Sequence, residues 1–338
     1  MTKIIEFFQA FKYPFMQYAL IAGIVIGIVC SIIGVFVLLR GMVFLGQAIA
    51  HSSFAGAALA ILLNVEPTLI IMGFSIISAV TIGYVNQKRL MKDEVIIGVV
   101  FSFFVALAAL FIGLKQEYTS DIKSVLFGNL LLVDREDFIL LIVFSALVVM
   151  LILLIKKELY FITFDSELAK ISGIPVNFLS YLFLILVSIT IAVSLKAIGA
   201  ILVFAMIVTP AAAAYQWTHK LNKMILLSVI FGVTSSILGL FMSYMLDLAS
   251  AASIATTITA IFIISFAFSP KRRSMKKRID ECPFCKNHID PTGHCQNPEC
   301  KFGDIPHTHD HDRVGISIEH LPERTPTVHE HEKEEEEQ

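Results

Sequence analysis

The sequence has few charged residues. Only 16% of its 338 residues are Asp, Glu, Lys or Arg, whereas 56% are hydrophobic and the mean hydropathy is +0.78. A soluble globular domain usually carries about 25% charged residues. Apolar stretches without charge recur from residue 15 to residue 268. This pattern excludes an ordinary cytosolic enzyme, a disordered protein and a nucleic-acid-binding protein, and it predicts that residues 1–270 lie in a lipid bilayer.

Two chemical features are also absent. The sequence contains no G-x-x-x-x-G-K-[ST] loop, so the chain cannot bind and hydrolyse ATP by the P-loop mechanism. The apolar stretches are nearly free of Asp and Glu, and Asp247 lies only at the end of one of them. A secondary transporter would need such carboxylates to couple ions or protons, which disfavours that class. The chain is therefore expected not to be an enzyme, and a separate polypeptide would have to hydrolyse any ATP that drives it.

Nine apolar stretches can form transmembrane helices, because a helix needs about 20 apolar residues to cross the hydrocarbon core. They are residues 15–39, 42–63, 67–87, 95–114, 137–155, 179–195, 198–217, 224–246 and 250–268. The predicted fold class is an all-α polytopic membrane protein with about nine transmembrane helices, or eight if a short connection at Arg40 or Lys196 hides a miscount. Pro210 is expected to kink or end its helix.

The positions of Lys and Arg predict the orientation. Basic residues collect at 88–92, 156–170, 220–223 and 271–278, and with nine spans these loops share one side of the membrane with Arg40. That side is expected to be cytoplasmic. The N-terminus then lies outside and the C-terminal tail inside.

The tail differs sharply in composition from the rest of the chain. Eight of the ten histidines and four of the five cysteines follow residue 280. We predict a transmembrane domain over 1–270, a basic juxtamembrane linker over 271–280, a zinc-ribbon-like module over 281–303 and a disordered His/Glu-rich tail over 304–338.

The four tail cysteines are Cys282, Cys285, Cys295 and Cys300, a C-x2-C…C-x4-C array. Four thiolates on two such turns favour the closed tetrahedral site that structural zinc prefers. Disulfides are the poorer interpretation on the cytosolic side, where thiols stay reduced. His288 and His294 lie close enough in sequence to replace a cysteine ligand, although bystander roles are favoured.

Alternating imidazoles and carboxylates follow the ribbon. The histidines of these runs are His307, His309, His311, His329 and His331. They predict weak, exchangeable binding of zinc or similar ions. The alternative is a charged, disordered end that keeps the chain soluble.

His51 is an ionisable side chain near the middle of the second predicted span, and Gln47 precedes it by four residues on the same helix face. A polar ring at this depth is costly and indicates a functional site. A neutral imidazole is a good ligand for zinc, iron or manganese, and an amide carbonyl can assist with harder ions. The alternative is a histidine that only hydrogen-bonds between helices.

Residues 46–59 resemble the G-D-x-[LI]-[SA]-H-x-x-x-x-G stretch of the permease subunits of zinc and manganese ABC importers. Residues 93–102, 124–129 and 196–213 resemble further motifs of that family, in the same order. The resemblance implies that His51 touches the metal as it crosses. The family pattern has an Asp four residues earlier, where this chain has Gln47, and a neutral amide attracts a divalent cation less strongly.

Residues 165–173 favour a short amphipathic helix, because Leu168 and Ile171 are three residues apart and Gly173 can cap its end. This helix could dock in a groove of a partner or lie on the lipid headgroups. It resembles the coupling loop by which the family's permeases contact their ATPase. The matching residues are Asp165, Glu167, Ala169 and Gly173.

The function predicted from these observations is the membrane subunit of an ATP-driven importer of divalent transition metals, with zinc first and manganese or iron next. The resemblance implies a homodimer in a prokaryotic cell membrane, a P-loop ATPase partner and an extracytoplasmic metal-binding protein, and no nucleic acid. The predicted cofactor is structural zinc in the ribbon, with ATP acting only through the partner. The alternative is a membrane-anchored metal sensor that uses the Cys/His tail.

Overall fold

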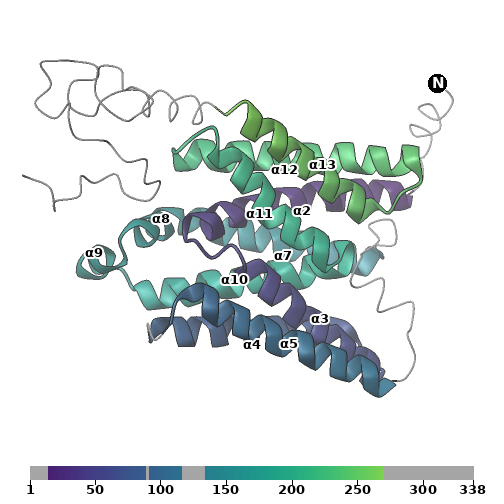
Figure 1. Cartoon of the computed structure of the whole chain (residues 1–338), viewed down its shortest axis with the longest axis horizontal. Helices are drawn as coiled ribbons and strands as arrows, with labels where there is room; N and C mark the ends of the chain where they lie inside the picture. The colour runs from purple at the N-terminus through teal and green to yellow at the C-terminus, as the bar shows by residue number, and fades with distance from the viewer. Residues whose placement is uncertain (1–13, 89–90, 116–133, 270–338) are drawn as a thin grey trace, which may run out of the picture. The chain divides into compact units, whose positions relative to one another are not determined.

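The computed structural model describes residues 14–88, 91–115 and 134–269, and the regular elements in these ranges are helices (Figure 1). Their bounds are α2 Pro14–Leu39, α3 Leu45–Leu63, α4 Pro67–Gln87, α5 Asp93–Lys115, α7 Arg135–Leu154, α8 Lys156–Phe164, α9 Ser166–Ile171, α10 Val176–Ile198, α11 Ala200–Tyr215, α12 Leu221–Leu246 and α13 Ser250–Ala267. The all-helical prediction is confirmed for this part of the chain.

Each of the nine predicted spans coincides with a helix. Eight of these helices are long and apolar enough to cross a membrane, while α11 is apolar but has 16 residues. Pro210 lies inside α11, so the proline does not end the helix, although it removes one backbone hydrogen-bond donor from it. The described residues therefore form a polytopic helical bundle.

Local sequence accounts for several helix boundaries. α4 begins at Pro67, whose fixed φ and missing N–H suit the first helical position. Asp93 and Glu94 lie in the first turn of α5, as Glu136 and Asp137 do in α7, where carboxylates interact favourably with the helix dipole.

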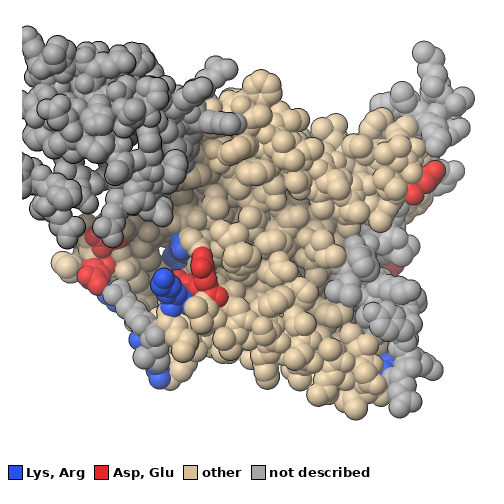
Figure 2. All heavy atoms as spheres, in the orientation of Figure 1, with Lys and Arg blue, Asp and Glu red and all other residues tan. Residues whose placement is uncertain are grey.

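Polar groups inside the helices are mostly satisfied locally. The hydroxyls of Ser53, Thr190 and Thr257 each donate to the carbonyl four residues earlier, at 2.9, 2.9 and 2.7 Å. Such bonds remove the cost of an unpaired hydroxyl in an apolar medium. On the face shown in Figure 2, the visible Lys, Arg, Asp and Glu side chains lie toward the two ends of the bundle, with an uncharged band between them. This distribution is the one that a bilayer requires.

The two ends of the bundle carry different structures. The short helices α8 and α9 connect α7 to α10 at one end, on the left in Figure 1. At the opposite end α10 is followed directly by α11, with only Gly199 between them. These two ends hold, respectively, the predicted coupling segment and a cluster of charged residues around Lys196.

Candidate transport path and coupling segment

The predicted path residues are the partly exposed positions within a buried stretch of α3. Between residues 45 and 58 of α3 every residue is buried except Gln47 and His51, which are partly exposed. The two side chains are four residues apart and share a face. No hydrogen bond joins either of them to another described residue. We call this surface of α3 the open face.

No hydrogen bond from a described neighbour occupies the nitrogens of His51. Its ring lies edge-on to Phe101 of α5, with centroids 4.9 Å apart and an interplanar angle of 88°. The hydroxyls of Ser52 and Ser53 both donate to the Ile49 carbonyl, at 2.8 and 2.9 Å. The imidazole therefore remains available to a ligand on the open face.

The open face of a single chain has too few donors to hold a metal ion by itself. Among the described residues, no three His, Cys, Asp or Glu side chains lie close enough together to hold a metal ion. One imidazole and one amide are fewer donors than the four to six that a divalent transition metal normally takes. The remaining donors would have to come from water, the transported complex or a second chain.

The predicted coupling segment forms a capped helix. Asp165 accepts hydrogen bonds from the backbone N–H groups of Glu167 and Leu168, at 3.0 and 2.8 Å, and so caps the start of α9. At the other end Gly173 adopts φ +82, its N–H donates to the Lys170 carbonyl and the N–H of Ile174 donates to the Ala169 carbonyl. This is a Schellman termination.

One side of α9 is anchored while the other is exposed. Ala169 is fully buried and packs with Ile162, Val176 and Leu179. In contrast, Phe164, Leu168 and Ile171 are 65%, 49% and 83% exposed. The segment therefore presents a preorganised apolar edge at the end of the bundle.

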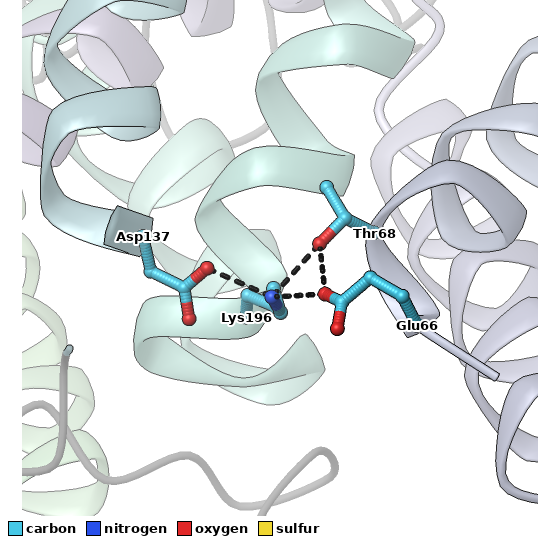
Figure 3. Close-up of polar contacts among 4 residues, drawn as sticks. All are labelled: Glu66, Thr68, Asp137 and Lys196. Carbon is cyan, nitrogen blue, oxygen red and sulfur yellow. Dashed lines mark hydrogen bonds and ion pairs between the residues drawn. The ribbon is translucent and has the colours of Figure 1, made fainter. Parts of the chain in front are cut away.

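A cluster that the sequence analysis did not identify lies at the opposite end (Figure 3). The ammonium of Lys196, in the last turn of α10, donates to Asp137 of α7 at 2.7 Å, to Thr68 of α4 at 2.8 Å and to Glu66 at 3.3 Å. The Thr68 hydroxyl in turn donates to Glu66 at 2.9 Å. This Lys196 cluster links α10 to α7 and to the start of α4. In the sequence, Lys196 is visible only as a lysine three residues before a glycine, and its acidic partners lie far from it along the chain.

Two further basic groups are held within the bundle. The Arg40 guanidinium, just after α2, lies 4.6 Å from the ring centroid of Phe183 in α10. Burial lowers the pKa of Arg40 to about 10, so this side chain stays charged at neutral pH. Lys115, at the end of α5, donates to the Ile61 carbonyl at the end of α3 at 2.7 Å.

The predicted metal ligands of the tail lie outside the described residues. They are Cys282, Cys285, Cys295 and Cys300 of the ribbon, and His307, His309, His311, His329 and His331 of the tail. Of the predicted site residues, the structure brings Gln47 and His51 together on α3, and places Asp165, Glu167, Ala169 and Gly173 around α9.

Comparison with known proteins identifies the family. Residues 12–269 match the model of the ABC 3 transport family. The chain belongs to the ABC 3 transport family. This match covers the helices themselves, and the chain is thus the membrane-spanning permease subunit of an ABC transporter.

Named relatives cover the same region. The manganese transport system membrane protein MntC of Listeria innocua is 40% identical over 273 residues, which are 80% of this chain and 97% of the relative. The manganese import system permease protein ScaB of Streptococcus gordonii is 37% identical over 275 residues, 81% of this chain and 99% of the relative. The solved structure of PsaBC from Streptococcus pneumoniae in complex with Fab is similar, with a TM-score of 0.73, 37% identity and coverage of 81% of this chain and 99% of that chain.

Proposed function

We propose that this chain is the permease subunit of an ATP-driven importer of divalent transition metal ions, with manganese as the main substrate. The names of the relatives support manganese and give no specific support to zinc, which the sequence motifs alone placed first. They likewise give no support to the sensor alternative, because the family match spans the helices that a sensor would use only as an anchor.

The open face of α3 is proposed to be the metal path. Its support is the burial pattern, in which Gln47 and His51 are the partly exposed residues of an otherwise buried stretch. The imidazole and the amide carbonyl are donors that manganese or iron accepts. Two copies of the chain that faced each other across this surface would double the donor set to four, and we therefore propose a homodimer.

The exposed edge of α9 is proposed to bind a P-loop ATPase. Phe164, Leu168 and Ile171 supply an apolar surface, and the caps at Asp165 and Gly173 fix the helix that carries part of it. An amphipathic helix of this kind docks in a groove of a partner at low entropic cost, since it is already folded.

The orientation follows from the charges. With the α9 end in the cytoplasm of a bacterial cell, the basic loops lie inside, as the positive-inside rule requires. The end with the Lys196 cluster then faces outward, where an extracytoplasmic binding protein would deliver the metal.

The tail is proposed to bind metal in two ways. The four cysteines from Cys282 to Cys300 would hold one structural zinc ion. The histidines from His307 to His331 would bind metal weakly and exchangeably. Deletion of residues 306–338 should leave uptake at low metal intact if this tail is accessory, and complete loss of uptake would refute that view.

Metal content of whole cells tests the main proposal. Cells that depend on this chain are grown under manganese and then zinc limitation, and their metals are measured by mass spectrometry. His51→Ala should reduce cell manganese to the level of cells without the transporter at unchanged protein level. His219→Ala, an exposed histidine beyond α11, is the matched control and should retain uptake. A selective zinc shortfall in His51→Ala cells would overturn the choice of manganese, and unchanged content of both metals would remove His51 from the path.

A further inference from the structure

The His51 ring lacks, among the described residues, the hydrogen bond that usually orients a metal-binding histidine. Such a histidine binds the metal through one ring nitrogen and donates from the other to a carboxylate, a carbonyl or water, and this second bond fixes the ring. The nearest hydroxyls do not fill that role, because Ser52 and Ser53 both donate to the Ile49 carbonyl. A described neighbour can therefore orient the imidazole only by packing against it.

Phe101 of α5 is the neighbour that packs against this ring. The two ring centroids are 4.9 Å apart and the ring planes meet at 88°. Edge-on contacts of this kind are favourable, because the electropositive edge of one ring meets the electronegative face of the other. Rotation of the imidazole would give up this contact, so Phe101 favours one orientation of the His51 side chain over the others.

The place of Phe101 on α5 explains how it reaches the open face. One face of α5 carries four residues at helical spacing, and these are Ile97, Phe101, Phe104 and Ala108. Three of them, Ile97, Phe104 and Ala108, are 1%, 6% and 2% exposed, and α5 packs on α3. Phe101 belongs to the same stripe but is only partly buried, as His51 is. Its ring therefore lies at the margin of the contact between α3 and α5, supported by the stripe and next to the path.

Phe104, three residues further along the same stripe, has a different kind of partner. Its ring lies 6.0 Å from that of Phe74 in α4, at an interplanar angle of 64°. This contact joins two apolar side chains of neighbouring helices and can serve only packing. The contact of Phe101, in contrast, is made with the one ionisable side chain of the open face.

We propose that Phe101 is a positioning residue of the metal path, whose ring holds the His51 imidazole in the orientation that receives the metal. The ring contact takes the place of the missing hydrogen bond. It leaves the lone pair of the imidazole free, whereas a hydrogen-bond donor would occupy it. This inference rests on the proposed function, because the orientation of His51 matters only if the metal passes it.

Initial rates of radiolabelled manganese uptake test the role of Phe101 in cells that depend on this chain. Rates are measured over a range of manganese concentrations and divided by the amount of chain in the membrane. Phe101→Leu keeps an apolar side chain but removes the ring, and the maximal rate should fall about fivefold, which is what a favourable edge-on pair amounts to. The half-saturating concentration should stay the same, because capture by the extracytoplasmic protein precedes the path. Phe101→Tyr keeps the ring and should retain the wild-type rate.

Phe104→Leu is the matched control. It makes the same change on the same face of α5, but at a side chain that meets Phe74 and not His51. Because Phe104 is buried, its substitution should lower the thermal midpoint of the purified chain in detergent more than Phe101→Leu does. Its maximal rate per molecule of chain should remain that of the wild type. A residue that only stabilises the bundle would thus change the midpoint, whereas a positioning residue changes the rate.

A second background shows whether Phe101 acts through the imidazole. His51→Gln keeps a metal donor but has no ring, so adding Phe101→Leu to it should leave the residual rate unchanged, as expected when two substitutions remove one shared contact. An undiminished loss in this background, or equal losses in Phe101→Leu and Phe104→Leu, would overturn the positioning role. So would a wild-type rate in Phe101→Leu while His51→Ala abolishes uptake, although the proposed path would then stand. Normal uptake in His51→Ala would instead refute the path itself.

Discussion

The open face and the Lys196 cluster are two polar regions within a predominantly apolar bundle, and they are built in opposite ways. At the cluster, one ammonium meets three oxygens from residues in or beside α4 and α7. On the open face, Gln47 and His51 emerge from a buried stretch of α3, and no hydrogen bond joins them to another described residue. A polar group in a membrane protein is costly unless it is paired. The comparison therefore indicates that the cluster stabilises the bundle, whereas the open face keeps two polar side chains without a hydrogen bond to another described residue, as the proposed metal path requires.

Loss of the Gln47 amide should give the largest effect, and it should fall on transport alone. Gln47→Leu keeps the volume of the side chain but removes a donor from the path. Manganese uptake should fall about 10-fold or more, by analogy with the loss of groups that support a metal site. The thermal midpoint of the purified chain should stay the same or rise, because an unpaired polar group has been removed. A fall in the midpoint together with normal uptake would contradict this assignment.

Lys196→Met should have the opposite effect, with its main loss in stability rather than in transport. The substitution leaves Asp137, whose side chain is 25% exposed, without its partner, and breaking a partly buried pair is expected to destabilise the chain by about 2–3 kcal/mol. Thermal unfolding in detergent measures this loss. The double variant Lys196→Met/Asp137→Asn is the control and should recover part of the stability, since it no longer leaves a charge unpaired. Equal stability of Lys196→Met and wild type would show that the cluster is not a structural clamp.

Features set by neighbouring residues in the sequence could be predicted, whereas contacts between distant helices could not. Helix positions were predicted closely because apolar runs and end signals are local, and α9 was expected from Leu168, Ile171 and Gly173, which lie within six residues of one another. The Lys196 cluster could not be predicted in this way. Its partners Asp137 and Glu66 are 59 and 130 residues distant in sequence, and only the packing of α4, α7 and α10 brings them together.

The candidate site, too, could be predicted only where its signal lies within one segment of the sequence. Gln47 and His51 were found because a helical spacing and a polar ring at membrane depth are visible in one segment. The contact between His51 and Phe101 joins α3 to α5, and a single sequence carries no record of that pairing. The burial that singles out the open face likewise depends on several helices at once.

Asp165→Ala should have an intermediate effect at the other end of the bundle. The substitution removes the side chain that caps α9, and loss of such a cap costs about 1 kcal/mol. If α9 binds the ATPase as a folded helix, the affinity for the ATPase should fall about fivefold, without loss of global stability. Binding measured on the purified chain tests this, and Asp165→Asn, which keeps the capping oxygen, should bind nearly as wild type does. Equal affinity of the Ala variant and wild type would refute the coupling role of α9.

The smallest effect should be the contribution of Glu66 to the pH dependence of stability. Hydrogen bonds from Thr68 and then Lys196 lower the pKa of Glu66 below its ordinary value of 4.5. A carboxyl whose pKa is lower in the folded state stabilises the fold above its unfolded pKa, and this contribution disappears as the pH falls through the folded pKa.

The thermal midpoint of the wild type should therefore decrease more than that of Glu66→Gln between pH 6 and the acid range below the ordinary pKa. The difference should be small, because the Glu66 side chain is 72% exposed, and Thr68→Val should reduce it because the first cause of the shift is removed. Parallel midpoint curves for wild type and Glu66→Gln would show that Glu66 gains nothing from the cluster, whose stabilising pair would then be Lys196 and Asp137 alone.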